Sequence, residues 1–136
     1  MDPNFPRAHI NLGMAYLQKE MYSEAVSESI KGYTLWEADP ENMASLKAAY
    51  EASGMRGYWQ ERLKQAKGVM KHSYYSPYYV ATFYAQLGEQ DKAFEWLEKA
   101  YQERNEHMMS VKINPLFDSL HSDPRFQDLL HRIGLS

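Results

Sequence analysis

The chain has no cysteine in its 136 residues, which excludes disulfide bonds and thiolate metal sites and leaves the compartment open. It also lacks a basic excess, because 15 lysines and arginines are scattered among 18 aspartates and glutamates. Since neutralised phosphates supply most of the affinity for nucleic acids, this balance argues against nucleic-acid binding. The longest uncharged run, between Lys71 and Glu89, contains five tyrosines. It is too polar to cross a bilayer, so we expect no membrane insertion, and the polar start does not predict a signal peptide.

Patterns typical of catalysis or metal binding are missing as well. None of the five histidines belongs to a His-Glu-x-x-His pair, no glycine-rich loop is suited to a phosphate, and no serine stands in a nucleophile-elbow context. The charged residues around Glu95, Glu98 and Lys99 have the spacing of solvated ion pairs on a helix. We therefore predict no catalytic residue, no metal, no cofactor and no enzymatic activity.

What the chain does contain is a repeat. Tyr16, Tyr50 and Tyr84 are spaced by 34 residues, and an aliphatic residue precedes each of them by four positions. Small residues recur sixteen positions after each tyrosine, at Gly32, Ala66 and Ala100. A fixed period of this length is typical of stacked helix–turn–helix units. The sequence therefore predicts an all-α fold, an α-solenoid of three such repeats.

Prolines and glycines mark where the helices begin and end. Pro40 and Pro77 follow capping residues and predict helix starts. Gly54 and Gly88 predict helix ends, since glycine adopts the left-handed conformation cheaply. After Arg104 the period fails, and two further short helices are expected to open at Asn114-Pro115 and Asp123-Pro124.

These boundaries predict one domain over residues 1–136. The repeats are expected at about 6–39, 40–73 and 74–107, followed by short capping helices over about 108–136. A solenoid needs such an atypical, amphipathic end to cover its last apolar face.

The frame resembles the tetratricopeptide repeat. The third unit carries the best match, through Val80, Ala81, Tyr84, Gly88, Ala93, Leu97 and Ala100. The main departure is Trp59, which stands where the family has a small residue. The run from Ser122 to Leu130 is similar to the ends of bacterial multidomain regulators, in which a repeat array follows a kinase, cyclase or DNA-binding domain. That resemblance implies a module excised from a longer protein.

The resemblance also implies a protein-interaction module that binds a peptide or protein segment on the concave face of the first helix of each repeat. The residues expected on that face are Asn11, Met14, Gln18, Ala48, Tyr75, Tyr78, Tyr79 and Thr82. Three alternatives stay open. The tyrosines could simply pack in the core, the C-terminal tail could fill the groove itself, or the chain could associate with a second copy as a homo-oligomer.

Overall fold

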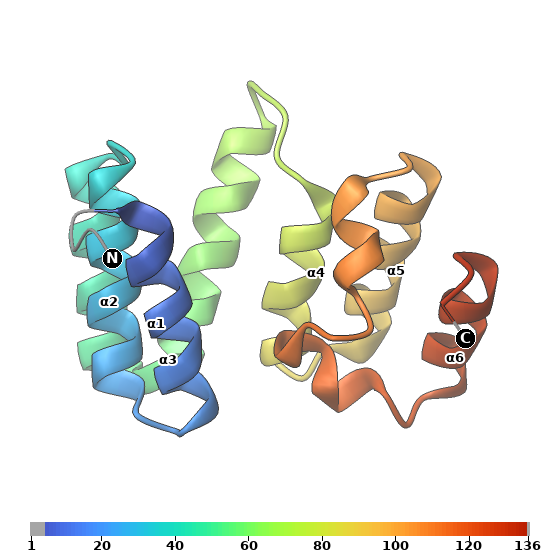
Figure 1. Ribbon diagram of the computed structural model, residues 1–136. Helices are drawn as coiled ribbons and strands as arrows, with labels where there is room; N and C mark the ends of the chain where they lie inside the picture. The colour runs from blue at the N-terminus through green and yellow to red at the C-terminus, as the bar shows by residue number, and fades with distance from the viewer. Residues whose placement is uncertain (1–4, 136) are drawn as a thin grey trace. The chain divides into compact units, whose positions relative to one another are not determined.

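The computed structural model describes residues 5–135, and within that range it contains helices and no strands. In chain order these are α1 (Pro6–Gln18), α2 (Tyr22–Leu35), α3 (Pro40–Met70), α4 (Pro77–Gln86), α5 (Gln90–Gln102), the 3-10 helices η1 (Glu106–Ser110) and η2 (Pro115–Leu120), and α6 (Pro124–Arg132). The prediction of an all-α helical repeat is confirmed (Figure 1). The chain divides into an N-terminal unit, Met1–Glu61, and a C-terminal unit, Arg62–Ser136. The predicted boundaries of the repeats and of the cap stay a prediction.

In the N-terminal unit, α1 and α2 lie side by side (Figure 1). Their close packing depends on Gly32, because a Cβ atom there would lie 2.6 Å from Cγ1 of Ile10 and 2.9 Å from the carbonyl oxygen of Pro6. The same helix pair is joined by His9 and Glu28, whose Nδ1 and Oε2 atoms are 2.7 Å apart. Gly32, the first of the three recurring small residues, thus serves the contact between α1 and α2.

Helix α3 contains a sharp break that separates residues 40–52 from residues 55–70. Gly54 has φ 65° and ψ −154°, and Ser53 before it is also outside the helical region. This backbone region is essentially restricted to glycine, so the helix end predicted at Gly54 is confirmed. The start is also as predicted, since the Asp39 carboxylate accepts a hydrogen bond of 2.8 Å from the Glu41 backbone N–H.

The C-terminal unit is built around α4, which is buried at eight of its ten positions. Helix α5 packs beside it, and the end of α3 contributes cations over its aromatic rings. The Arg62 guanidinium lies 4.9 Å from the Phe83 ring centroid, and Lys67 Nζ lies 5.6 Å from that of Tyr84. Tyr84 is 6% exposed, which fits the packing role indicated by its place in the repeat.

Residues 105–135 are a well-packed part of this unit. Asn105, Asn114 and Asp123 each cap a helix by accepting a backbone N–H two residues later. The pairs Asn114-Pro115 and Asp123-Pro124 predicted η2 and α6. No proline follows Asn105, and η1 was not predicted. Val111, Phe117, Leu120 and Phe126 are fully buried, so this segment adds substantially to the apolar core.

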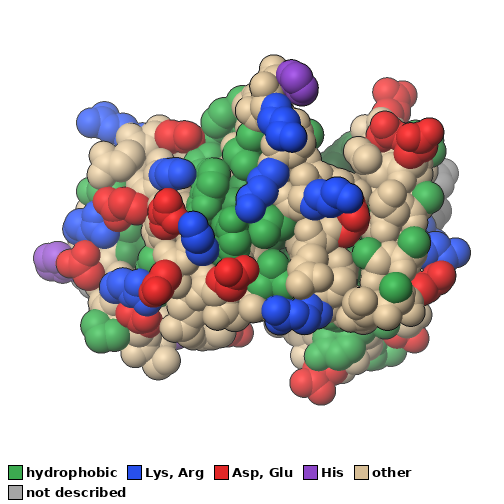
Figure 2. Space-filling view, turned by 180° about the vertical axis from the view of Figure 1, so that it is seen from behind, with side chains coloured by type: hydrophobic (Ala, Val, Ile, Leu, Met, Phe, Trp, Pro, Cys, Tyr) green, Lys and Arg blue, Asp and Glu red, His purple; other side chains and the backbone are tan. Residues whose placement is uncertain are grey.

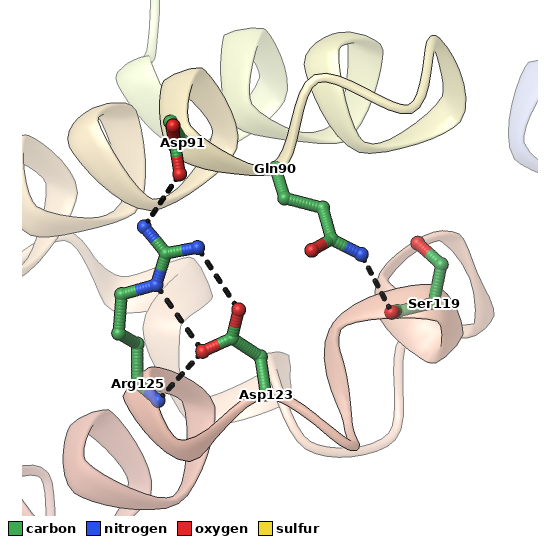
Figure 3. Close-up of polar contacts among 5 residues, drawn as sticks. All are labelled: Gln90, Asp91, Ser119, Asp123 and Arg125. Atoms are coloured by element: carbon green, nitrogen blue, oxygen red, sulfur yellow. Dashed lines mark hydrogen bonds and ion pairs between the residues drawn. The ribbon is translucent and has the colours of Figure 1, made fainter.

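Arginines fasten α6 to α5. Arg125 reaches Asp91 on α5 at 2.9 Å while also holding Asp123, and Gln90 donates to the Ser119 carbonyl nearby (Figure 3). Farther along, Arg132 grips both carboxylate oxygens of Glu98 at 2.9 Å. Both guanidinium groups also lie over aromatic rings of α5, Arg125 over Phe94 and Arg132 over Tyr101.

The Arg132–Glu98 pair predicts a pH dependence. The hydrogen bonds from Arg132 hold the pKa of the Glu98 carboxyl below its ordinary value of 4.5. Because the folded-state pKa is lowered, this stabilisation is fully present above about pH 4.5 and is lost as the pH falls through the lowered value. We expect Arg132→Gln to reduce the free energy of unfolding at pH 7 by roughly 0.5–1 kcal/mol, as for other exposed pairs, and to flatten its acid dependence.

Urea unfolding from pH 7 to pH 3 would measure both effects, with Glu98→Gln and the double variant completing a cycle. An acid dependence in Arg132→Gln equal to that of the wild type would show that the pair contributes nothing.

Candidate functional site

The face of α4 on which a partner was predicted is covered by the chain's own C-terminal segment. Tyr78 is 3% exposed, and its hydroxyl accepts a 3.0 Å hydrogen bond from the Asn114 amide. Its ring meets Phe117 edge-on at 5.3 Å between centroids and lies 5.6 Å from the His107 ring. Burial raises the pKa of the Tyr78 hydroxyl, which therefore stays protonated and neutral.

Neighbouring side chains extend this cover along α4. The Gln86 amide donates to the Leu116 carbonyl at 2.9 Å, and the Tyr79 hydroxyl lies 3.3 Å from Nε2 of His107. Thr82 is 2% exposed and turns its hydroxyl to the Tyr79 carbonyl at 2.6 Å. Of the predicted residues on α4, only Tyr79 is substantially exposed, at 42%. The segment around η1 and η2 thus lies where a bound peptide was expected.

The other predicted residues lie on separate elements. Asn11, Met14 and Gln18 lie along one stripe of α1, with Met14 half-buried and the other two exposed. Ala48 is exposed on the first part of α3, and Tyr75 is half-buried ahead of α4. Tyr75 contacts Tyr79 and Phe83 with ring centroids 6.5 Å and 6.4 Å apart. Whether these residues bind a partner stays a prediction.

A groove of 510 Å³ opens elsewhere on the C-terminal unit. The end of α3, the connection after it and one face of α5 form its walls. The lining residues are Met70, Ser73, Tyr74, Tyr75, Pro77, Glu95, Trp96, Glu98, Lys99, Gln102 and Glu103. In Figure 2, hydrophobic side chains are visible on the face shown, with acidic and basic side chains around them. We call the groove formed by the lining residues named above the aromatic groove.

Polar contacts hold the aromatic side chains of this groove in place. The Tyr74 hydroxyl donates a 2.8 Å hydrogen bond to the Glu103 carboxylate, which raises the pKa of Tyr74. Tyr74 is nevertheless 66% exposed, so its ring is free to make further contacts. On α5, Lys99 Nζ lies 3.9 Å from the centroid of the Trp96 ring. The groove therefore presents rigid aromatic surfaces beside carboxylates.

Sequence reasoning did not identify this groove. It treated Glu95, Glu98 and Lys99 as ion-pair residues along one helix. Glu95 pairs in that way with Lys92 at 3.6 Å, whereas Glu98 pairs with Arg132 of α6 and Lys99 lies over the Trp96 ring. The available signal was the presence of Tyr74 and Trp96, two large aromatics that no repeat position requires. Their juxtaposition depends on how the connection after α3 folds against α5, and periodicity carries no information about that.

The described residues also bear on metal binding and on membrane insertion. Across residues 5–135, no three histidine, aspartate or glutamate side chains come together as metal ligands would. Over the same part of the chain, each helix is too short or too polar to traverse a membrane.

Comparison with known protein families identifies a repeat in two parts of the chain. The tetratricopeptide repeat model matches residues 6–35 and 80–107, which hold the α1–α2 pair and most of the α4–α5 pair. These two stretches of the chain match the tetratricopeptide repeat. Tetratricopeptide repeats generally mediate protein–protein interaction and are not themselves catalytic modules. No curated protein and no solved structure matched this chain.

The matched ranges leave out residues 36–79, the part of the chain that contains Trp59. Trp59 is 6% exposed and meets Tyr58 edge-on at 5.0 Å between ring centroids. A large buried indole replaces the small residue that helix–helix contact in this family requires. The departure noted in the sequence thus has a structural counterpart in the middle of the chain.

Proposed function

We propose that this protein is a protein-interaction module that binds a peptide segment of its partner in the aromatic groove of the C-terminal unit. The observation that carries the proposal is the groove itself, in which Tyr74, Tyr75 and Trp96 line one surface of 510 Å³. Tyrosine and tryptophan offer large contact areas at a low cost in side-chain entropy. Such residues dominate the binding energy of protein interfaces.

Two features favour the groove over the α4 face. The α4 face is already filled by Asn114, Leu116 and Phe117 from the same chain, so a partner would have to displace a buried segment. The groove requires no such displacement, since Tyr74 is already exposed. Rigid-body docking onto a preformed site is the less costly route to binding.

Peptides selected against the wild-type protein from a random display library would test the proposal. We expect Tyr74→Ala to weaken their binding by about tenfold, the loss of one interface aromatic of roughly 1.4 kcal/mol. Because Tyr74 is largely exposed, the variant should fold normally. Ile113→Ala is the control, because it removes an apolar side chain that is 80% exposed on the same unit and lies outside the groove lining.

If the selected peptides bound Tyr74→Ala and the wild type equally, the aromatic groove would not be the partner site. If the same peptides lost affinity on Asn11→Ala or Met14→Ala instead, the predicted α1 stripe would be the partner site.

A bacterial regulatory role is part of the proposal. It is supported by the likeness of residues 122–130 to the ends of bacterial multidomain regulators. A repeat module placed there would bring a partner to the regulator's catalytic or DNA-binding domain.

Self-association is the second candidate. The N-terminal unit exposes several large apolar side chains, and such surfaces often mark contact with another protein. They are Phe5, Leu12, Met21, Tyr22, Leu35 and Trp36, each 40% exposed or more. Sedimentation over a range of protein concentrations tests this candidate, and a monomer throughout would exclude it.

A further inference from the structure

The aromatic groove contains a cation and a carboxylate that do not meet each other. Lys99 lies 3.9 Å over the Trp96 ring and makes no ion pair with any residue between 5 and 135. It differs in this from Arg125 and Arg132, which also cover rings of α5 but hold aspartate or glutamate as well. Lys99 therefore binds the ring face alone, through a cation–π contact.

Glu103 is the complementary case. Its carboxylate accepts the Tyr74 hydroxyl at 2.8 Å, but within the described residues it has no cationic partner. The other two groove carboxylates are neutralised by cations outside the lining, Glu95 by Lys92 at 3.6 Å and Glu98 by Arg132 at 2.9 Å. The Glu103 carboxylate thus keeps a negative charge that no cation of the described residues pairs with, next to the exposed ring of Tyr74.

We propose that the partner segment carries a basic side chain, arginine or lysine, flanked by apolar residues. This inference rests on the proposed function and names the chemistry of its partner. The cationic head pairs with Glu103, and its aliphatic stem lies across the rings of Tyr74 and Trp96. Arginine suits both contacts, because its planar guanidinium donates to a carboxylate and stacks on aromatic faces.

Lys99 then acts as an internal competitor of the incoming cation. It is on the same helix as Glu103, one turn earlier, and its ammonium group covers the Trp96 face that the partner's stem or head would contact. Like charges within one groove repel, so Lys99 limits the affinity for basic segments. For a neutral segment it imposes no such electrostatic penalty.

Three matched nonapeptides, acetylated and amidated, test the proposal. Each has a central Leu-Xaa-Leu in which Xaa is arginine, its neutral isostere citrulline, or glutamate. Binding is followed by the Trp96 indole N–H resonance, assigned from its absence in Trp96→Phe. We expect the arginine peptide to bind about fivefold more tightly than the citrulline peptide, the effect of one exposed charge pair. Glu103→Gln should abolish that preference.

Removing the internal cation gives the second arm of the test. Lys99→Met should strengthen binding of the arginine peptide by about threefold and leave the citrulline peptide unchanged, because it removes charge repulsion while retaining an apolar stem. Lys64→Met is the matched control, since it removes the same charge from an exposed lysine that lies outside the groove lining and pairs with no groove carboxylate. It should leave the ratio of the two affinities unchanged.

Three outcomes would overturn the inference. Equal binding of the arginine and citrulline peptides at Trp96 would contradict a basic partner segment, and so would tighter binding of the glutamate peptide. Either result would still leave the groove as the partner site. If no peptide perturbs Trp96 and library-selected peptides also bind Tyr74→Ala normally, the proposed function falls together with the inference.

Discussion

Replacing Phe117 by alanine is expected to lower the free energy of unfolding of the C-terminal unit by about 3–5 kcal/mol, the usual cost of deleting a buried phenylalanine ring. Phe117 is fully buried and meets the Tyr78 ring edge-on at 5.3 Å between centroids. Removing it leaves a cavity against α4 and uncovers Tyr78. The reason for the large effect is that η2 is part of the core and not a loosely attached tail.

Urea unfolding followed by circular dichroism would measure the loss, and amide hydrogen exchange would assign it to α4 and the residues after it. Met109→Ala is the control, because Met109 belongs to the same segment and is 64% exposed. We expect the control to change stability by less than about 0.5 kcal/mol. A small effect of Phe117→Ala would mean that the segment detaches readily, and the α4 face would again be available to a partner.

Replacing Gly54 by alanine is expected to cost about 1–3 kcal/mol, the strain of holding a residue with a Cβ in a region that glycine alone occupies freely. Gly54 has φ 65° and ψ −154°. A Cβ atom built there meets no atom within 4 Å, so the loss reflects backbone strain and not steric contact. The break between the two parts of α3 depends on this residue.

Gly68→Ala is the matched control for this prediction. A Cβ at Gly68 also meets nothing within 4 Å, but the residue lies in regular helix near the end of α3. Alanine there should stabilise the protein by roughly 0.5–1 kcal/mol, since glycine is the weaker helix former. Thermal unfolding of both variants gives the comparison. If both substitutions changed the stability in the same direction, backbone strain at Gly54 would not explain the effect of Gly54→Ala.

These two predictions distinguish residues that stabilise the fold from residues that are available for binding. Phe117 and Gly54 shape the protein, one by filling space and one by permitting a turn. Tyr74, Lys99 and Glu103 lie at the surface and contribute little core. Variants in the second group should therefore change binding while leaving the fold intact, which makes the groove experiments interpretable.

Local sequence signals predicted the helices well. Capping residues before Pro40, Pro115 and Pro124 begin helices as expected, and Gly54 ends one. These signals are reliable because they act through hydrogen bonds and backbone preferences within a few residues. The one helix that was missed, η1, has Asn105 as its cap but no proline after it.

The sequence by itself determined that this protein is a helical repeat. The tyrosines and small residues that recur every 34 residues mark the packing positions of successive helix–turn–helix units. Only the tertiary structure decided which surfaces remain open. Tyr78 and Thr82 stand at positions predicted to lie on the concave face, yet both are buried. Asn114 and Phe117, more than thirty residues later in the chain, contact Tyr78. Tyr74 and Trp96 line the same groove for the same reason. Burial depends on contacts between distant segments, and no periodicity within the chain records them.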